Sequence, residues 1–202
     1  TYSEHWDLPI HVHIIDPSAD SLAKLKQLKL SFTHCKTNPA VLKFPYSYET
    51  YCQAQRFILL GHNLTKNQSV IVADVDSYSL RRPSDKQQNL LKSDMAFTEY
   101  NGRLMATFCN FHHGRRQQAK KAAVKMTKLI TESDMIGVDQ FVIKEIFSKY
   151  GYNRLQHRVW IRHLDVKTKQ DLSHHNKCLI YHEKGTRGKG KGIKVSWTDI
   201  GL

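Results

Sequence analysis

Apolar residues occur along the chain in short blocks whose spacing changes between that of strands and that of helices. Residues 10–15 and 70–75 are runs of strand length rich in isoleucine and valine, and the first is followed by an Asp-Pro-Ser turn. Residues 21–30 carry leucines at helical spacing, and residues 46–61 form a second helical block that ends at a glycine. This alternation predicts an α/β fold with a mixed sheet.

The second half of the chain continues the alternation. Strand-like runs follow at 95–99, 104–111 and 178–182, and helical blocks at 117–130 and 139–150. The Asn-Gly pair at 101–102 predicts a hairpin turn between the first two of these strands. We therefore expect a single domain over residues 1–183, followed by a basic, glycine-rich tail or lid over 184–202.

Composition limits the class of protein. With 202 residues, 40% of them hydrophobic, the chain is long enough for one well-packed domain. It has no apolar run of the roughly 20 residues that span a membrane, and no secretory signal is visible. The four cysteines lack a Cys-x-x-Cys pair, which argues against a structural zinc site and favours reduced thiols, although disulfides stay open. The predicted location is the cytoplasm, with peripheral contact to a membrane as a second option.

The chain is strongly basic. Lysine and arginine total 31 against 18 aspartate and glutamate residues, a formal net charge of +13. Such an excess attracts anionic partners, among them nucleic acid, anionic membrane surfaces and phosphorylated small molecules. Two clusters stand out, at 115–121 and 184–194, whereas much of the remaining charge follows helix faces as solvated surfaces do. Charge alone does not choose among these partners.

Two aspartates spaced one residue apart lie at the end of the apolar run that begins at residue 70. In an extended chain Asp74 and Asp76 point to the same side, at the place where a buried strand meets solvent. Two carboxylates so placed can hold a hard divalent cation, which in turn neutralises phosphate oxygens. The alternative is a plain turn in which one aspartate caps the next segment.

A histidine near the carboxyl terminus has a similar setting. His182 ends an apolar strand and is followed by Lys184, Gly185, Arg187 and Lys189. A neutral imidazole can ligate a metal, a glycine lets the backbone approach a ligand, and the cations can hold a diphosphate. The alternative is a surface histidine in a solvated basic tail.

Two further positions are candidates for contacts with a substrate. Arg56 lies in the helical block at 46–61 and either reaches a phosphate or ribose or pairs with a surface acid. Asp139 and Gln140 open the block at 139–150, where the aspartate either caps the helix or, with Gln140, faces the hydroxyls of a sugar. The usual hydrolase, nucleoside-triphosphatase and dinucleotide motifs are absent from the sequence.

Taken in order, these motifs resemble those of the retaining, metal-dependent glycosyltransferases of the glycogenin and bacterial lipopolysaccharide galactosyltransferase type. The matching features are Arg56, the Asp-x-Asp motif in 73–76, the pair at 139–140 and His182-x-x-Gly185. The resemblance implies an α/β/α sandwich with a mixed, mostly parallel central sheet, the nucleotide-diphospho-sugar transferase (GT-A) fold. The first nucleotide-binding strand of that family is expected before residue 10. Either it lies upstream of residue 1, or base binding is built differently in this protein.

The resemblance also implies a function in carbohydrate biosynthesis. A hexosyltransferase of this type moves a sugar from a nucleotide-diphosphate donor, here expected to be a UDP-sugar, to a hydroxyl of a glycan, lipid-linked glycan or protein. It implies that Mn²⁺ or Mg²⁺ is held by Asp74, Asp76 and His182, and that Asp139 and Gln140 orient the sugar at the catalytic centre. The donor would be bound by Arg56, Asp74, Val75, Asp76, Lys184, Gly185, Arg187 and Lys189.

Two alternatives stay open. The first is a basic nucleic-acid-binding protein, which the net charge and the two basic clusters favour. It ranks below the transferase because it gives no reason for two acids at the end of a buried strand. The second is a truncated or inactive protein of the transferase fold that acts as a binding module.

Overall fold

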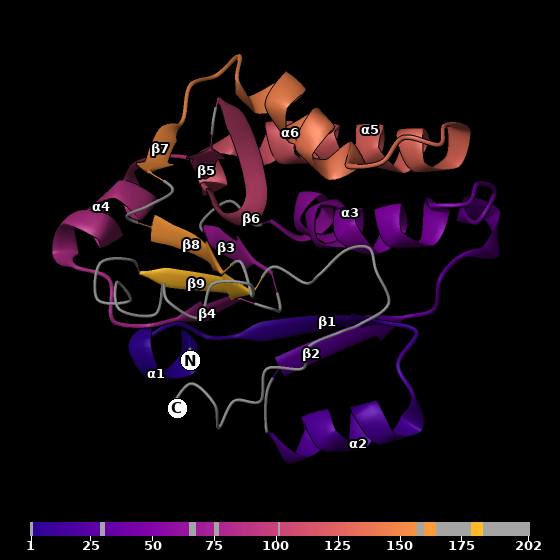
Figure 1. The fold of residues 1–202 in the computed structure, drawn as a ribbon, viewed down its shortest axis with the longest axis horizontal. Coiled ribbons are helices and arrows are strands. Elements are labelled where there is room, and N and C mark those ends of the chain that lie inside the picture. The colour runs from indigo at the N-terminus through magenta and orange to yellow at the C-terminus, as the bar shows by residue number, and fades with distance from the viewer. Residues whose placement is uncertain are drawn as a thin grey trace.

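A computed structural model of the chain describes residues 2–28, 31–64, 68–74, 77–100, 102–156, 160–164 and 179–183. These residues form a mixed α/β protein with a four-stranded mixed sheet, a two-stranded parallel sheet and a small three-stranded sheet (Figure 1). The predicted α/β class is confirmed. Within the described part of the chain, no helix is both long and apolar enough to cross a membrane.

The described helices and strands follow the predicted order with several additions. The α-helices are α1 (Tyr2–His5), α2 (Ala19–Gln27), α3 (Ser47–Asn63), α4 (Asp85–Ser93), α5 (Arg116–Glu132) and α6 (Val138–Phe147). The strands are β1 (His11–Ile15), β2 (Ser31–Cys35), β3 (Val70–Ala73), β4 (Ser77–Ser79), β5 (Ala96–Tyr100), β6 (Arg103–Phe111), β7 (Asn153–Gln156), β8 (Ile161–Leu164) and β9 (Ile180–Glu183).

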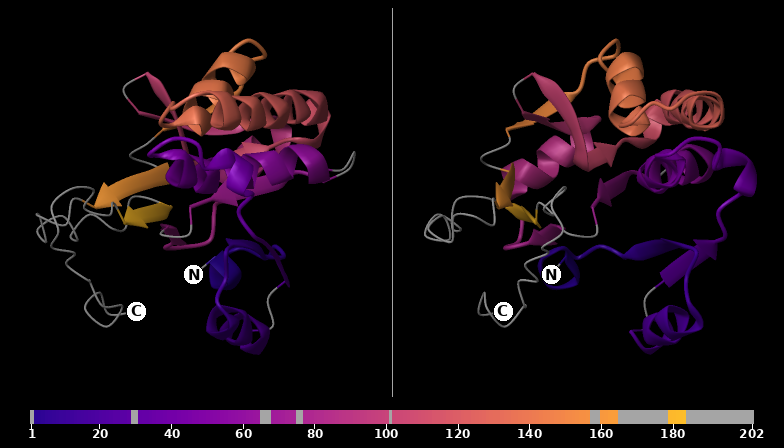
Figure 2. Two further views of the ribbon diagram at one scale, coloured as in Figure 1. Left: turned by 90° about the vertical axis from the view of Figure 1, so that its right-hand side faces the viewer. Right: turned by 45° about the vertical axis from the view of Figure 1, so that its right-hand side comes forward.

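The chain begins with a parallel β1–α2–β2 unit. Strands β1 and β2 pair in parallel, and α2 makes the crossover between them. Ser18 starts α2 as its N-cap, because its hydroxyl accepts a hydrogen bond from the backbone N–H of Ser21 at 3.1 Å. Figures 1 and 2 show this unit at one end of the molecule, with α5 and α6 at the other.

The four-stranded sheet has the order β3-β6-β5-β7. Strand β6 is antiparallel to both β3 and β5, and only β7 is parallel to its neighbour β5. The prediction of a mostly parallel sheet is therefore wrong for this sheet. One reason is the predicted hairpin between β5 and β6, because the paired residues Tyr100 and Arg103 leave a two-residue connection that returns the chain antiparallel. Gly102 lies in this turn with φ of 70°, which glycine adopts at little cost.

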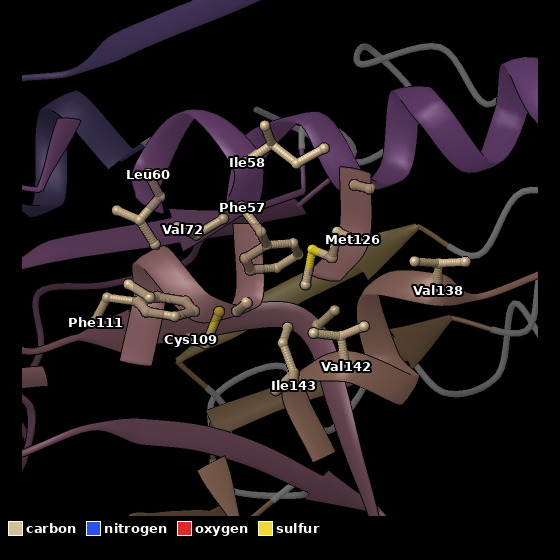
Figure 3. Close-up of a cluster of buried hydrophobic side chains, with 14 of the residues drawn as sticks. Phe57, Ile58, Leu60, Val72, Cys109, Phe111, Met126, Val138, Val142 and Ile143 are labelled. Carbon is tan, nitrogen blue, oxygen red and sulfur yellow. The ribbon is translucent and has the colours of Figure 1, made fainter. Parts of the chain in front are cut away.

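Helices α3, α5 and α6 cover one face of this sheet. Their apolar side chains meet those of β3 and β6 in the larger core, where Phe57, Val72, Phe111, Met126 and Val142 lie together (Figure 3). The predicted amphipathic character of α5 is confirmed, since its buried residues recur at helical spacing. Helix α3 packs so closely on α5 that a Cβ atom on Gly61 would lie 2.5 Å from the Cβ of Ala123.

The other face of the sheet packs against a second, smaller core. This core joins Phe108 of β6 to Leu91 of α4, Trp6 after α1 and Ile180 of β9. Strand β9 lies between β4, to which it is antiparallel, and β8, to which it is parallel. Helix α4 was not predicted, although its start carries a capping box in which Ser84 and Gln87 bond reciprocally.

Candidate functional site

Three of the residues singled out in the sequence meet in one ion-pair cluster. The Arg56 guanidinium, from the middle of α3, pairs with Asp74 through Nη1 and with Asp139 through Nη2, the latter at 3.3 Å from Oδ2. Asp74 lies directly after β3, and Asp139 lies in the first turn of α6. The fold thus brings together side chains that lie up to 83 residues apart in sequence.

The position of Asp74 is set by the sheet and by the strand that follows. Its backbone N–H donates to the carbonyl of Thr107 at 2.9 Å, which extends the pairing of β3 with β6 by one residue. Its carbonyl accepts two hydrogen bonds from Ser77, one from the backbone N–H at 3.1 Å and one from the hydroxyl at 2.5 Å. The start of β4 therefore holds the backbone of Asp74 in place.

Burial dominates the electrostatics of Asp139. Its side chain is only 3% exposed, and this burial raises the pKa of its carboxyl, against which the positive charge of Arg56 acts. Among the described residues, nothing donates a hydrogen bond to Asp139 Oδ1, and Arg56 Nε donates to no acceptor. The cluster therefore holds one buried donor, Arg56 Nε, and one buried acceptor, Asp139 Oδ1, without partners among the described residues. Such atoms destabilise a fold unless a further group bonds to them.

Cys109 borders this cluster from β6. Burial raises the pKa of its thiol to about 12, while the charge of Arg56 lowers it and that of Asp139 raises it. Burial thus favours the protonated, uncharged form of the thiol. Its role is to fill the core beside the ion pairs.

The two members of the Asp139–Gln140 pair have different surroundings. Helix α6 starts after Gly137, the N-cap, whose φ of 73° turns the chain into the helix. Asp139 is thus the second helical residue, and the alternative that it caps the helix is wrong. Its carboxylate faces Arg56 and the core, whereas Gln140 is exposed.

The pairing of β4 with β9 brings the His182 backbone close to the Asp-x-Asp motif. Ser77, which directly follows Asp76, lies opposite His182 in the antiparallel register. The His182 side chain lies outside the described part of the structure, as do residues Val75, Asp76, Lys184, Gly185, Arg187 and Lys189. The tail predicted for 184–202 lies outside it as well.

A metal centre of Asp74, Asp76 and His182 is compatible with the chemistry of these donors. Two carboxylates and one imidazole suit a divalent ion such as Mn²⁺. Within the described ranges, no group of three or more His, Cys, Asp and Glu side chains is placed to hold a metal. Since two of the three predicted ligands lie outside those ranges, the metal site stays a prediction.

The amino-terminal residues support this site, which was not predicted from the sequence. The Tyr2 hydroxyl lies 3.1 Å from the Ser77 hydroxyl, which in turn donates to the Asp74 carbonyl. Four residues later, Trp6 Nε1 donates to the Ser79 hydroxyl at 2.6 Å. The one local signal is the spacing of the two aromatic residues, which places them on the same side of a helical turn.

Replacing Tyr2 by phenylalanine should cost about 1 kcal/mol of stability at pH 7, because it removes the hydrogen bond between the Tyr2 and Ser77 hydroxyls. The cost should also depend on pH. Burial raises the pKa of Tyr2 to about 12 from 10, so its stabilising contribution is complete below pH 10 and is lost as the pH rises toward 12. Denaturant unfolding of both proteins from pH 8 to 11.5 measures this convergence.

The matched control for this substitution is Tyr46→Phe, because the Tyr46 side chain is 52% exposed. It should change stability by less than about 0.5 kcal/mol at any pH. An equal loss in both variants, or a Tyr2→Phe deficit that stays constant to pH 11.5, would contradict the role assigned to the Tyr2 hydroxyl.

Comparison of the chain with models of protein families and with curated protein sequences finds no match.

Proposed function

We propose that the protein is a metal-dependent glycosyltransferase that moves a sugar from a nucleotide-diphosphate donor to an acceptor hydroxyl. The observation that carries the proposal is the cluster of Arg56, Asp74 and Asp139. These residues belong to three separate sequence motifs, and their side chains meet in ion pairs. A chance set of motifs would have no reason to converge in this way.

The surroundings of the cluster also support the proposal. The four-stranded sheet carries helices α3, α5 and α6 on one face and the second core, with α4, on the other, which is compatible with a layered α/β arrangement. Asp74, the first residue of the Asp-x-Asp motif, directly follows β3 of that sheet. The β4–β9 pairing places the His182 backbone opposite Ser77, which follows the motif. We infer retention of the anomeric configuration from the resemblance of the motifs alone.

Each residue then has a chemical role. Cleavage of the anomeric bond puts negative charge on the departing diphosphate, and Arg56 with Lys184, Arg187 and Lys189 would stabilise that charge with hydrogen bonds. A divalent ion held by Asp74, Asp76 and His182 would supply Lewis-acid stabilisation of the same oxygens.

The exposed Gln140 is the member of its pair that is open to a sugar hydroxyl. Asp139, being buried, would act by orienting Arg56. Its unused Oδ1 would gain a partner if donor binding shifted the cluster.

The test is thermal unfolding of the full chain with a panel of nucleotide-sugars, each with and without Mn²⁺. A donor at 100 times its dissociation constant should stabilise the protein by about 2.7 kcal/mol, or an increase in Tm of roughly 5–10 °C. The increase should require the metal and should disappear in Asp76→Asn and in His182→Ala. Asp134→Asn removes an exposed carboxylate and should leave it unchanged.

Two results would reject the proposal. The first is a Tm that no nucleotide-sugar raises in the presence of Mn²⁺ or Mg²⁺. The second is a sugar transfer activity that persists in full when the metal is chelated. Steep, salt-sensitive and metal-independent binding of mixed oligonucleotides would support the nucleic-acid alternative instead.

A further inference from the structure

The outward face of α5 carries several lysines that the proposed catalytic site does not use. Gln117, Lys121, Val124 and Lys128 follow one another at intervals of four, three and four residues and are all exposed. Together with Lys120 and Lys125 they line a shallow surface hollow. We call these six residues the α5 face. The opposite side of the helix packs against α3 and α6, so the helix is held rigidly with this face outward.

The positive charge of the α5 face is only partly neutralised within the protein. Lys125 pairs with Glu145 of α6, and Lys128 lies 3.8 Å from Glu132. Neither Lys120 nor Lys121 pairs with an acid of the described residues. The preceding Arg115 differs, because Asp94 and the carbonyl of Tyr150 hold its guanidinium in place. The face therefore presents uncompensated positive charge that is not needed to hold the fold together.

Exposed apolar side chains accompany this charge. Val124 is 65% exposed in the middle of the lysines. Phe141 of α6 is 45% exposed and lies under the ammonium group of Lys125, 5.7 Å from its ring centre. Ile136, just before α6, is 61% exposed. Figure 1 shows α5 and α6 side by side at the upper edge of the molecule.

We propose that the α5 face is a docking surface for an anionic lipid bilayer. The lysines would lie among the negatively charged headgroups, and Val124 and Phe141 would reach the apolar boundary below them. Lysine suits this position because its long apolar stem lies along lipid while the ammonium group stays at the headgroups. Helix α5 would then lie flat on the surface, as interfacial helices do.

The apolar residues favour a bilayer over nucleic acid as the partner. Phosphate backbones are bound by cations and hydrogen-bond donors, and an exposed valine in the centre of the face adds nothing to such contact. At a bilayer the same valine contributes by leaving water. A polar residue at position 124 should therefore weaken binding to a bilayer and leave binding to nucleic acid unchanged.

The experiment measures co-sedimentation of the full chain with vesicles of phosphatidylcholine alone and with 30% phosphatidylglycerol added. We expect binding to the anionic vesicles only. The double variant Lys120→Gln/Lys121→Gln should bind them about 25-fold more weakly, since each lysine near an anionic surface contributes about fivefold. Val124→Ser should weaken binding by about two- to fivefold while leaving affinity for a mixed oligonucleotide unchanged.

The matched control is Lys86→Gln/Lys92→Gln, which removes the same charge from exposed positions on α4, far from α5 in Figure 1. It should retain most of the binding. Equal losses in the two double variants would show that only net charge matters and would overturn the proposal. So would undiminished binding of Lys120→Gln/Lys121→Gln, equal binding to neutral vesicles, or oligonucleotide binding that depends on the α5 face while vesicle binding does not.

Discussion

Replacing Arg56 by alanine should destabilise the protein by about 3 kcal/mol at pH 7. The change removes the partner of Asp139, whose side chain is 3% exposed, and leaves a buried carboxylate without a counter-charge. The sequence left two interpretations of Arg56, a contact with a phosphate or ribose of the donor and a pair with a surface acid. On the first, this replacement would weaken donor binding and spare the fold. Because Arg56 also pairs with Asp74 and Asp139, its replacement should in addition destabilise the fold, an effect that the local sequence does not predict.

The pH dependence of that cost identifies its source. Burial raises the pKa of Asp139 and Arg56 lowers it, so the pKa should rise further in Arg56→Ala. A raised pKa in the folded state means that stability is greatest when the group is protonated and falls as the pH rises through that pKa. The deficit of Arg56→Ala should therefore be small near pH 4 and grow toward pH 7. Urea unfolding at a series of pH values measures this deficit.

Two further variants control for this prediction. Adding Asp139→Asn to Arg56→Ala should restore part of the lost stability, because the buried charge is then gone. Arg154→Ala breaks the ion pair with Glu99, in which the arginine side chain is 71% exposed, and should cost less than about 0.5 kcal/mol. A pH-independent deficit, or no recovery in the double variant, would show that Arg56 acts only through its packing.

Replacing Gly61 by alanine should destabilise the protein by about 1–3 kcal/mol, although alanine normally favours a helix over glycine. The added Cβ would lie 2.5 Å from the Cβ of Ala123 and 2.6 Å from the carbonyl oxygen of Ala119, both on α5. The second of these atoms belongs to the backbone, so relief requires α3 and α5 to move apart. Thermal and denaturant unfolding measure the effect.

The control for Gly61 is its neighbour on the same helix. His62 is exposed, and His62→Ala should leave stability within about 0.5 kcal/mol of the original. Removing the Ala123 methyl group with Ala123→Gly should relieve only part of the Gly61→Ala strain, since the Ala119 carbonyl remains. A more stable Gly61→Ala protein would mean that the two helices do not approach as closely as described.

The sequence by itself determined the elements whose pattern is local. Helix α5 repeats small and apolar residues at a spacing that only a helix can bury on one side, and the Asn-Gly turn requires a hairpin. The short strands β2, β4, β7 and β8 were not predicted, because they lack such a local pattern. Each has three to five residues with polar positions among them, and it becomes a strand only by pairing with a partner from elsewhere in the chain.

The tertiary structure alone decided which candidate residues meet and in what surroundings. The motifs identified Arg56, Asp74 and Asp139, but no local pattern says that one guanidinium joins both acids or that Asp139 is buried. The support from Tyr2 to Ser77 likewise spans 75 residues. The periodicity of a helix or strand can be seen in residues that are neighbours in the sequence. Ion pairs, burial and the close contact at Gly61 depend instead on how distant segments pack, which is decided only when the whole chain folds.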